Sequence, residues 1–194
     1  TDIIVVGAGI AGIMTAYFLL QKTDKHVMIL EANKVAHGAT GHNAGQIVSY
    51  FEKPFADIVA EYGLDLAVRA QLSLYESWDL LADICKEAQL NTPVSSFTGY
   101  VGFTDWNTAL PYLEGLALQK KAGLSIEQAM VAEDAPGIET LSPHIRAEIA
   151  TVTRAHLAKI LQTNDPHYIA AMAGKKGVTN SALLTEEIVG YLLK

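Results

Sequence analysis

The sequence predicts an α/β fold in which parallel strands alternate with helices, and three observations near the N-terminus predict it. An apolar, β-branched run, Ile3–Val6, leads directly into the glycine-rich turn Gly7–Gly12. A helical pattern follows over Ile10–Gln21, and a second apolar run, Val27–Leu30, ends at the acidic Glu31. Strand, glycine turn, helix, strand and acidic residue in this order are typical of a dinucleotide-binding unit.

Each glycine of the turn has its own task in such a unit. Gly7 turns the chain tightly off the strand, Gly9 lets a pyrophosphate approach the backbone, and Gly12 lets the helix pack closely on the strand. The free N–H groups of the turn and the positive end of the helix dipole then attract the phosphates. The predicted cofactor-binding residues of the turn are Gly7, Ala8, Gly9, Ile10, Ala11 and Gly12.

The acidic residue narrows the choice of cofactor. Glu31 follows Gly7 by 24 positions, at the end of the second predicted strand. A carboxylate at this place accepts hydrogen bonds from a ribose diol and repels a 2′-phosphate. Ala32 and Asn33 follow it without an arginine. We therefore predict that Glu31 and Ala32 contact a ribose, that NADP is disfavoured, and that NAD or the ADP half of FAD remains.

The next segment distinguishes these two cofactors. Gly38–Ile47 reads GATGHNAGQI, a loop of small residues. It resembles the second signature of the D-amino-acid-oxidase-like (DAO) family of FAD-dependent oxidoreductases, a stretch similar to GASGRNGG. This family includes glycine oxidase, sarcosine oxidase and dimethylglycine dehydrogenase. The resemblance implies FAD as the cofactor and a loop that runs beside the diphosphate towards the flavin. The loop residues that it implies in cofactor binding are Thr40 and Asn43, through side-chain hydrogen bonds, and Ala44, Gly45 and Gln46, through backbone N–H groups.

His42 is the most specific residue of this loop. In dimethylglycine and sarcosine dehydrogenases a similar stretch, GSTWHAAG, carries a histidine that is covalently attached to the flavin 8-methyl group, whereas the commoner relatives have arginine there. This sequence departs from that stretch by having Gly41 for Trp and Asn43 for Ala. Two interpretations of His42 therefore stay open, a covalent link to FAD or a non-covalent contact near the diphosphate or the ring.

The resemblance also implies an architecture and a reaction. It implies a Rossmann-like FAD-binding domain interrupted by an α+β substrate domain, and oxidation of the C–N bond of a small amine or N-methylated amino acid by hydride transfer to flavin. Because flavin carries the reaction, we assign no catalytic side chain. Two alternatives remain, an NAD-linked dehydrogenase and a non-catalytic interaction module derived from a flavoprotein.

Composition restricts the partners. The chain has 194 residues and a net charge of −7, and its only arginines are Arg69, Arg146 and Arg154, so nucleic acid is disfavoured as a partner. A single cysteine, Cys85, excludes a disulfide framework and favours a reducing compartment, predicted to be the cytoplasm. The apolar stretch Ile10–Leu20 is too short to span a bilayer, so no integral membrane segment is expected. The oligomeric state stays open.

A metal site is not expected. His37 lies five residues before His42, but no nearby cysteine or carboxylate completes a set of ligands.

The resemblance further implies three functional parts. We expect residues 1–90 to form the first part of the FAD-binding domain, 91–176 part of the substrate domain, and 177–194 a return to the FAD-binding domain. The C-terminal stripe Leu184, Ile188, Tyr191 and Leu192 predicts a helix capped by Asn180 or Ser181. In a doubly wound fold such a helix feeds another strand, so we expect the chain to be the N-terminal part of a longer polypeptide. Further predicted elements are helices over 54–62, 64–88, 108–122, 156–162 and 168–173, a strand over 99–104, an ambiguous segment over 124–131 and loops over 33–50 and 174–177.

Overall fold

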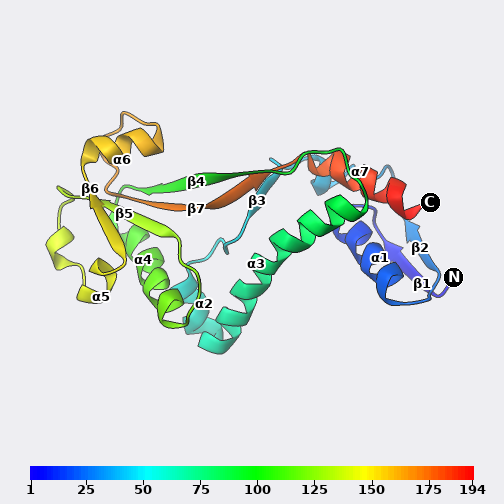
Figure 1. The fold of residues 1–194 in the computed structure, drawn as a ribbon, viewed down its shortest axis with the longest axis horizontal. Coiled ribbons are helices and arrows are strands. Elements are labelled where there is room, and N and C mark those ends of the chain that lie inside the picture. The colour runs from blue at the N-terminus through cyan, green and yellow to red at the C-terminus, as the bar shows by residue number, and fades with distance from the viewer. The chain divides into compact units, whose positions relative to one another are not determined.

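The computed structural model describes residues 1–194 and has a mixed α/β fold (Figure 1). The chain divides into two compact units. Unit 1 consists of residues 1–48, 79–96 and 177–194, and unit 2 consists of residues 49–78 and 97–176. The contacts thus group residues 49–78 with the second unit, whereas the functional partition at residues 90 and 176 stays a prediction.

Unit 1 contains the predicted strand–helix–strand arrangement. Strand β1 (Ile3–Val6) is followed by helix α1 (Ile10–Lys22) and strand β2 (Val27–Leu30). The two strands are parallel, with Ile3 opposite Val27 and Val6 opposite Leu30. The Gly7 N–H extends the ladder by donating to the Leu30 carbonyl at 2.7 Å. The prediction of a glycine turn between a strand end and a helix start is therefore confirmed.

Helix α7 (Ser181–Leu192) packs against α1 and completes the core of unit 1 (Figure 1). Ile13 from α1 and Leu184 and Ile188 from α7 are buried together. The Asn180 side chain caps α7 by accepting a hydrogen bond from the Leu183 N–H at 3.1 Å. The apolar stripe and the cap of the C-terminal helix are thus both confirmed.

The Glu87 carboxylate, at the end of helix α3 (Leu64–Glu87), accepts hydrogen bonds from both of these helices. The Tyr17 hydroxyl of α1 donates to Glu87 at 2.7 Å, and the Tyr191 hydroxyl of α7 donates to the same carboxylate at 2.8 Å. Burial and the hydrogen bond to Glu87 raise the pKa of Tyr17 to about 12, so this hydroxyl stays a donor. The three helices of unit 1 therefore meet at one negative charge.

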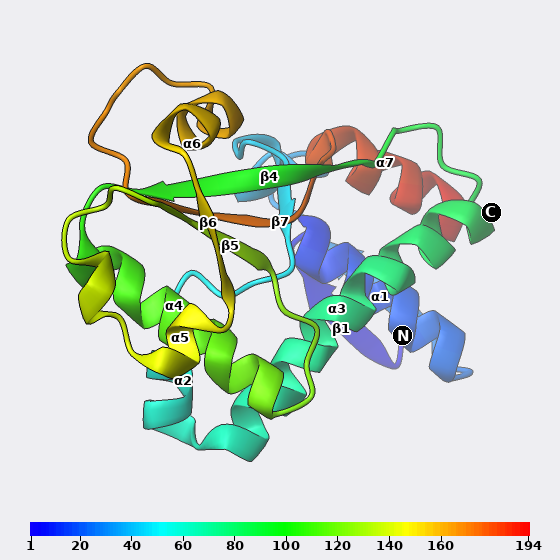
Figure 2. The ribbon, with the colours of Figure 1, turned by 60° about the vertical axis from the view of Figure 1, so that its left-hand side comes forward.

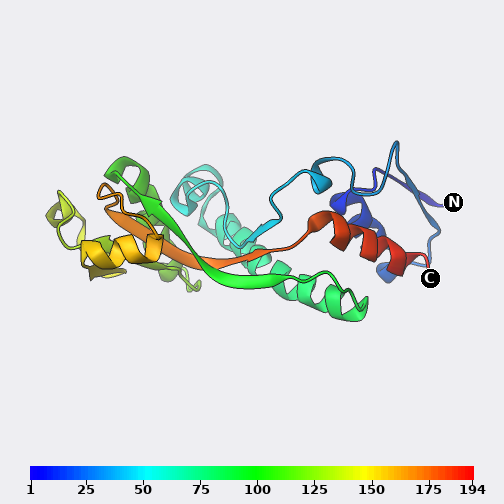
Figure 3. The same ribbon diagram turned by 90° about the horizontal axis from the view of Figure 1, so that it is seen from above.

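Unit 2 is built around a mixed sheet. Strand β5 (Gln128–Ala132) pairs in parallel with β6 (Ile149–Val152) and antiparallel with β7 (Ala170–Val178). Strand β4 (Ser95–Phe103) also pairs with β7, and the two run beside one another in Figure 3. The strand predicted over 99–104 is confirmed, and the ambiguous segment before Ala132 forms strand β5.

Helices cover both faces of this sheet. Helix α4 (Trp106–Lys121) lies on one side of β4 and β7, and α6 (Arg154–Leu161) lies on the other (Figure 2). Leu113 and Leu116 from α4 and Leu157 from α6 are all buried in the core around the strands. The remaining helical elements are α2 (Phe55–Tyr62), α5 (Pro143–Arg146) and the 3₁₀ turns η1 (Ala39–Gly41) and η2 (Ile138–Thr140). The short strand β3 (Gln46–Val48) and η1 occupy part of the predicted loop over 33–50.

Two predictions near the C-terminus are wrong. Residues 168–173 do not form a helix and 174–177 do not form a loop, because Ala170–Val178 is strand β7. The alanines of this run favour a helix in isolation, but pairing of Ala170–Ala173 with Val131–Gln128 of β5 overrides that weak preference. The four residues Ala170–Ala173 are buried, as a central strand requires.

Most of the apolar stripe that the sequence predicts for α3 is at least half-buried. The stripe is formed by residues that repeat at three and four positions, Leu64, Val68, Leu72, Tyr75, Trp78, Leu81 and Cys85. Trp78 is buried and Val68, Tyr75, Leu81 and Cys85 are half-buried, whereas Leu64 and Leu72 are 40 % and 43 % exposed. Ala67, Gln71 and Ile84 are buried as well, and polar Gln71 gives no apolar signal that would have predicted this.

Candidate functional site

The glycine turn of unit 1 has the close packing that the fingerprint predicts. Gly7 has φ +97°, in the region that favours glycine. A Cβ on Gly12 would lie 2.0 Å from the Gly7 carbonyl oxygen, so no side chain fits between the turn and α1. Gly9 is the N-cap of α1 and supplies no side-chain cap. The N-terminus of this helix therefore keeps backbone donors that no side chain of the cap satisfies.

Glu31 is held directly against the turn. One carboxylate oxygen accepts a hydrogen bond from the Ala8 N–H at 2.8 Å, and the other accepts one from the Asn33 N–H at 2.8 Å. The Ala8 N–H has the largest effect and the Asn33 N–H the next. Together they hold the pKa of Glu31 below its usual value and keep the carboxylate ionised. An ionised carboxylate has about four lone-pair positions, so two remain for a diol at this exposed side chain.

Thr40 anchors the small-residue loop to the same turn. Its hydroxyl oxygen accepts a hydrogen bond from the Ile10 N–H, in the first turn of α1, at 3.0 Å. A Cβ on Gly9 would lie only 3.1 Å from this oxygen. A second link joins the Ala36 N–H to the Ala8 carbonyl at 3.0 Å. The sequence assigned Thr40 to a cofactor oxygen, and the helix engages only one of the two lone pairs of its hydroxyl, so the hydroxyl proton is free to donate to a ligand.

Asn43 shapes the loop from within. Its amide nitrogen donates to the carbonyls of Ala39 at 3.0 Å and Thr40 at 2.8 Å. Its amide oxygen accepts from the Gly45 N–H at 2.7 Å and from the Ser181 hydroxyl at 3.0 Å. The amide nitrogen thus has both of its protons engaged, while the amide oxygen shares the single Ser181 proton with the Thr40 carbonyl. The structure therefore gives Asn43 a positioning role, in contrast to the direct cofactor contact that the resemblance implied.

His42 projects from the loop into solvent. Its Nδ1 lies 2.8 Å from the Gly38 carbonyl oxygen, which requires Nδ1 to carry the proton and leaves Nε2 unprotonated in the neutral ring. The His37 ring packs edge-on against it, with 5.9 Å between the ring centroids. No group of three or more His, Cys, Asp or Glu side chains gathers anywhere in the chain as a metal site would require.

The other predicted residues lie along the same strip of chain. Ala11 is exposed in the first turn of α1, Ala32 is exposed directly after Glu31, and Gln46 is exposed at the start of β3. Gly45 is buried with φ +67°, and a Cβ there would lie 2.0 Å from the Thr179 carbonyl oxygen. Its glycine thus permits a close approach of two backbone segments.

An open cleft of about 450 Å³ lies along the loop. Its walls come from the loop, from residues 93 and 95, and from the start of α7; they are Thr40, Gly41, Asn43, Ala44, Gly45, Pro93, Ser95, Val178, Thr179, Asn180, Ser181 and Ala182. The Ser181 hydroxyl holds this wall to the loop by donating to the Thr40 carbonyl at 2.7 Å. The Thr179 hydroxyl is buried without any hydrogen-bond partner. Sequence reasoning missed this wall, since its only signal was the helix cap at Asn180.

Comparison with known families agrees with this geometry. The family model for FAD dependent oxidoreductase (DAO) matches residues 2–186. The chain belongs to the DAO family. The recognition made from the glycine turn and the small-residue loop is thus confirmed.

Individual relatives match only part of the chain, at about 30 % identity. The chain is 30 % identical over 90 residues, 46 % of its length, to gamma-glutamylputrescine oxidoreductase of Escherichia coli (strain K12), covering 21 % of that protein. It is 32 % identical over 80 residues, 41 % of its length, to the probable oxidoreductase OrdL of Haemophilus influenzae, covering 18 % of that protein. The matched part is therefore about a fifth of each relative.

Two solved structures share the fold. Glycine oxidase from Bacillus cereus aligns with a TM-score of 0.59 and 17 % identity, over 99 % of this chain and 43 % of that one. L-proline dehydrogenase from P. horikoshii aligns with a TM-score of 0.63 and 15 % identity, over 98 % of this chain and 41 % of that one. At these identities the likeness concerns the fold. None of the helices of this chain has the length and apolar character needed to cross a membrane.

Proposed function

We propose that the protein binds FAD in unit 1 and oxidises the C–N bond of a small amine or amino acid. One observation carries the cofactor assignment. The Ala8–Glu31 and Ile10–Thr40 hydrogen bonds bring the glycine turn, the acidic residue and the small-residue loop to a single place. A dinucleotide needs these three groups together, for its diphosphate, its ribose and its second half.

The residues present fit FAD on three counts. Gly9 offers bare backbone at the start of α1 and makes no side-chain cap of its own, which suits a diphosphate. Glu31 keeps free lone pairs for the ribose diol. The cleft beside the loop contains an unpartnered polar atom, the Thr179 hydroxyl, which a ligand would satisfy.

In this proposal the contacts follow the chain from turn to loop. Gly7 to Gly12 surround the diphosphate, Glu31 and Ala32 the ribose, and the loop from Thr40 to Gln46 the flavin side. In this proposal His42 makes a non-covalent contact through Nε2, the ring nitrogen that the hydrogen bond from Nδ1 to the Gly38 carbonyl leaves free. Bound flavin supplies the two-electron acceptor for a hydride, and the protein orients the amine and excludes water.

The substrate class is supported by the relatives. The names of the matched proteins refer to one amine derivative, gamma-glutamylputrescine, and to two amino acids, glycine and proline. An NAD-linked dehydrogenase would use the same turn and carboxylate, but the small-residue loop that follows them favours FAD.

The test uses the full-length protein in its flavin-bound form. Under nitrogen, a panel of primary, secondary and N-methylated amines and amino acids is added, and the flavin absorption band is followed. Bleaching by at least one compound is the expected result. A flavin that no amine reduces would overturn the reaction and favour the non-catalytic alternative, whereas binding of NAD instead of FAD would overturn the cofactor.

A further inference from the structure

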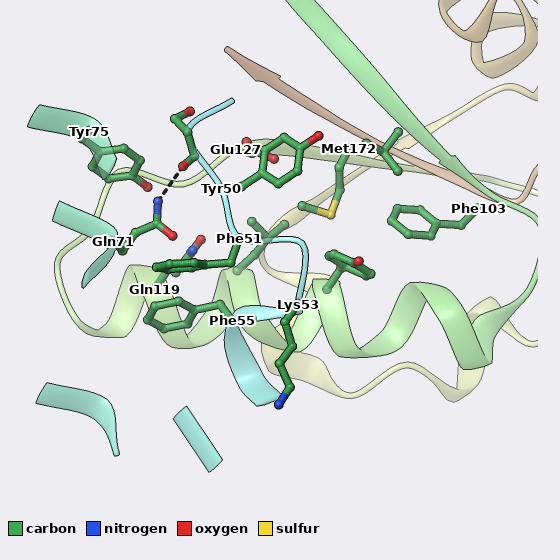
Figure 4. A pocket seen from close by; sticks show the side chains of 15 residues that line it. Tyr50, Phe51, Lys53, Phe55, Gln71, Tyr75, Phe103, Gln119, Glu127 and Met172 are labelled. Atoms are coloured by element: carbon green, nitrogen blue, oxygen red, sulfur yellow. Dashed lines mark hydrogen bonds between the residues drawn. The ribbon is translucent and has the colours of Figure 1, made fainter. Parts of the chain in front are cut away.

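Unit 2 contains a small cavity that the cofactor site does not use. Its volume is about 60 Å³, and it lies among α2, α3, α4, the segment before α2 and the strands of the sheet (Figure 4). Six aromatic rings line it, from Tyr50, Phe51, Phe55, Tyr75, Phe103 and Tyr112. Since a water-sized group needs about 10–15 Å³ on this measure, the cavity holds a ligand of about five non-hydrogen atoms.

One carboxylate, that of Glu127, faces this aromatic lining. It accepts no hydrogen bond, and no lysine or arginine nitrogen pairs with it. Burial raises its pKa, and the charge of Lys176, whose Nζ lies 5.4 Å from the centroid of the Tyr50 ring, opposes this shift only in part. On the neighbouring strand, a Cβ on Gly174 would lie 2.2 Å from a Glu127 carboxylate oxygen, so the glycine leaves the space that this side chain occupies.

Three other polar side chains of the lining are already engaged. The Tyr75 hydroxyl donates to the Ser125 carbonyl at 2.9 Å, and the Gln71 amide donates to the Ser49 carbonyl at 2.7 Å, the bond drawn in Figure 4. Lys53 pairs with Glu61, and its side chain points away from the cavity (Figure 4). Glu127 is thus the group of the cavity that lacks a partner of opposite charge.

We propose that this cavity binds the ammonium group of a short alkylamine. Glu127 is the counter-ion, and the surrounding rings contact the cation by their negative faces and the alkyl chain by their apolar surface. A carboxylate ligand is repelled by Glu127, and a neutral ligand leaves its charge uncompensated. The proposal rests on the proposed function in that the ligand is an amine, but it is tested by binding, without turnover.

The experiment measures binding of n-butylammonium, n-butanol and butyrate to the full-length protein by isothermal titration calorimetry, with the flavin spectrum recorded on each sample. We expect n-butylammonium to bind and the two other compounds to bind at least tenfold more weakly. Glu127→Gln is expected to weaken n-butylammonium binding at least tenfold. It should not lower the melting temperature, because glutamine has the shape of glutamate and removes a partly buried, unpaired charge. The matched control is Glu133→Gln, at an exposed carboxylate just after β5, which should leave binding unchanged.

Gly174→Ala is a second, independent variant. Its methyl group displaces the Glu127 carboxylate while keeping the charge, so a loss of n-butylammonium affinity is expected here as well. Equal binding of n-butylammonium and n-butanol, or unchanged affinity in Glu127→Gln, would overturn the proposal. A protein without flavin whose amine binding still depends on Glu127 would overturn the FAD assignment and support this site. A flavin-containing protein whose amine binding does not depend on Glu127 would overturn this site and leave the FAD assignment supported.

Discussion

Replacement of Gly12 by alanine tests the packing on which the cofactor site depends. The added Cβ would lie 2.0 Å from the Gly7 carbonyl oxygen, 3.1 Å from the Gly7 carbonyl carbon and 3.5 Å from Val5 Cγ1. Relief requires α1 to move away from β1 by about 1 Å, a strain of the kind that costs about 1–3 kcal/mol in packed interiors. Alanine recovers up to about 1 kcal/mol of helix propensity. We therefore expect the free energy of unfolding of unit 1 to fall by about 1–2 kcal/mol.

The matched control is Gly190→Ala. Gly190 lies in helix α7, and a Cβ there meets nothing within 4 Å, so alanine should stabilise unit 1 by about 0.5–1 kcal/mol. Urea denaturation of the full-length variants gives both values, and their difference of about 2 kcal/mol corresponds to about a thirtyfold change in the unfolding equilibrium. Gly12→Ala should also lose FAD on dilution. A Gly12→Ala protein as stable as Gly190→Ala, with its flavin retained, would refute the close packing of turn and helix.

Four further predictions concern three side chains of unit 1. Glu31→Gln should weaken FAD about tenfold in a fluorescence titration, with exposed Glu186→Gln as the unaffected control; unchanged affinity would remove Glu31 from the site. Because backbone donors lower the pKa of Glu31, its stabilising effect is complete above its unfolded pKa of about 4.3 and is lost as the pH falls through the lower folded value, which an acid titration of wild type against Glu31→Gln detects. Tyr17→Phe removes a hydrogen bond to a carboxylate and should lower the free energy of unfolding by about 1.5 kcal/mol in urea, and no loss would argue against that bond. Acid precipitation should release yellow FAD into the supernatant, whereas a yellow pellet would show that His42 is covalently linked.

The first βαβ unit could be predicted from sequence because its signals are local. The β-branched run, the glycine spacing and the helical pattern all lie between Thr1 and Glu31. Each strand or helix begins and ends within one residue of the pattern that predicts it. The helices α4 and α7 were equally readable, since a glycine with φ +78° follows the end of α4 and an asparagine caps α7. Local propensity and tertiary structure agree at these places.

Strand β7 could not be predicted because its structure is decided by a partner. The run Ala170–Ala173 has no β-branched residue and is a strand only because β5 pairs with it. Its glycine at position 174 resembles a loop signal, although it makes room for the Glu127 side chain. Such a distant steric requirement leaves no trace in the neighbouring residues.

The sequence predicted which segments form the candidate site, but not the role of each residue in it. The turn, the acidic residue and the small-residue loop were predicted to work together, and hydrogen bonds through Glu31 and Thr40 join them. The sequence could not indicate that the Asn43 amide makes its hydrogen bonds within the loop and to Ser181, or that residues 179–182 form the far wall of the cleft. The bond to Ser181 and the cleft wall join segments more than 130 positions apart, which only the folded chain brings together.

The most direct test of the central claim is an equilibrium titration of the full-length apoprotein with FAD and, in parallel, with NAD. If the turn between β1 and α1 holds the diphosphate of FAD, the protein takes up FAD to saturation and turns yellow, while NAD binds much more weakly. A protein that remains colourless in excess FAD, or that prefers NAD, would contradict the account.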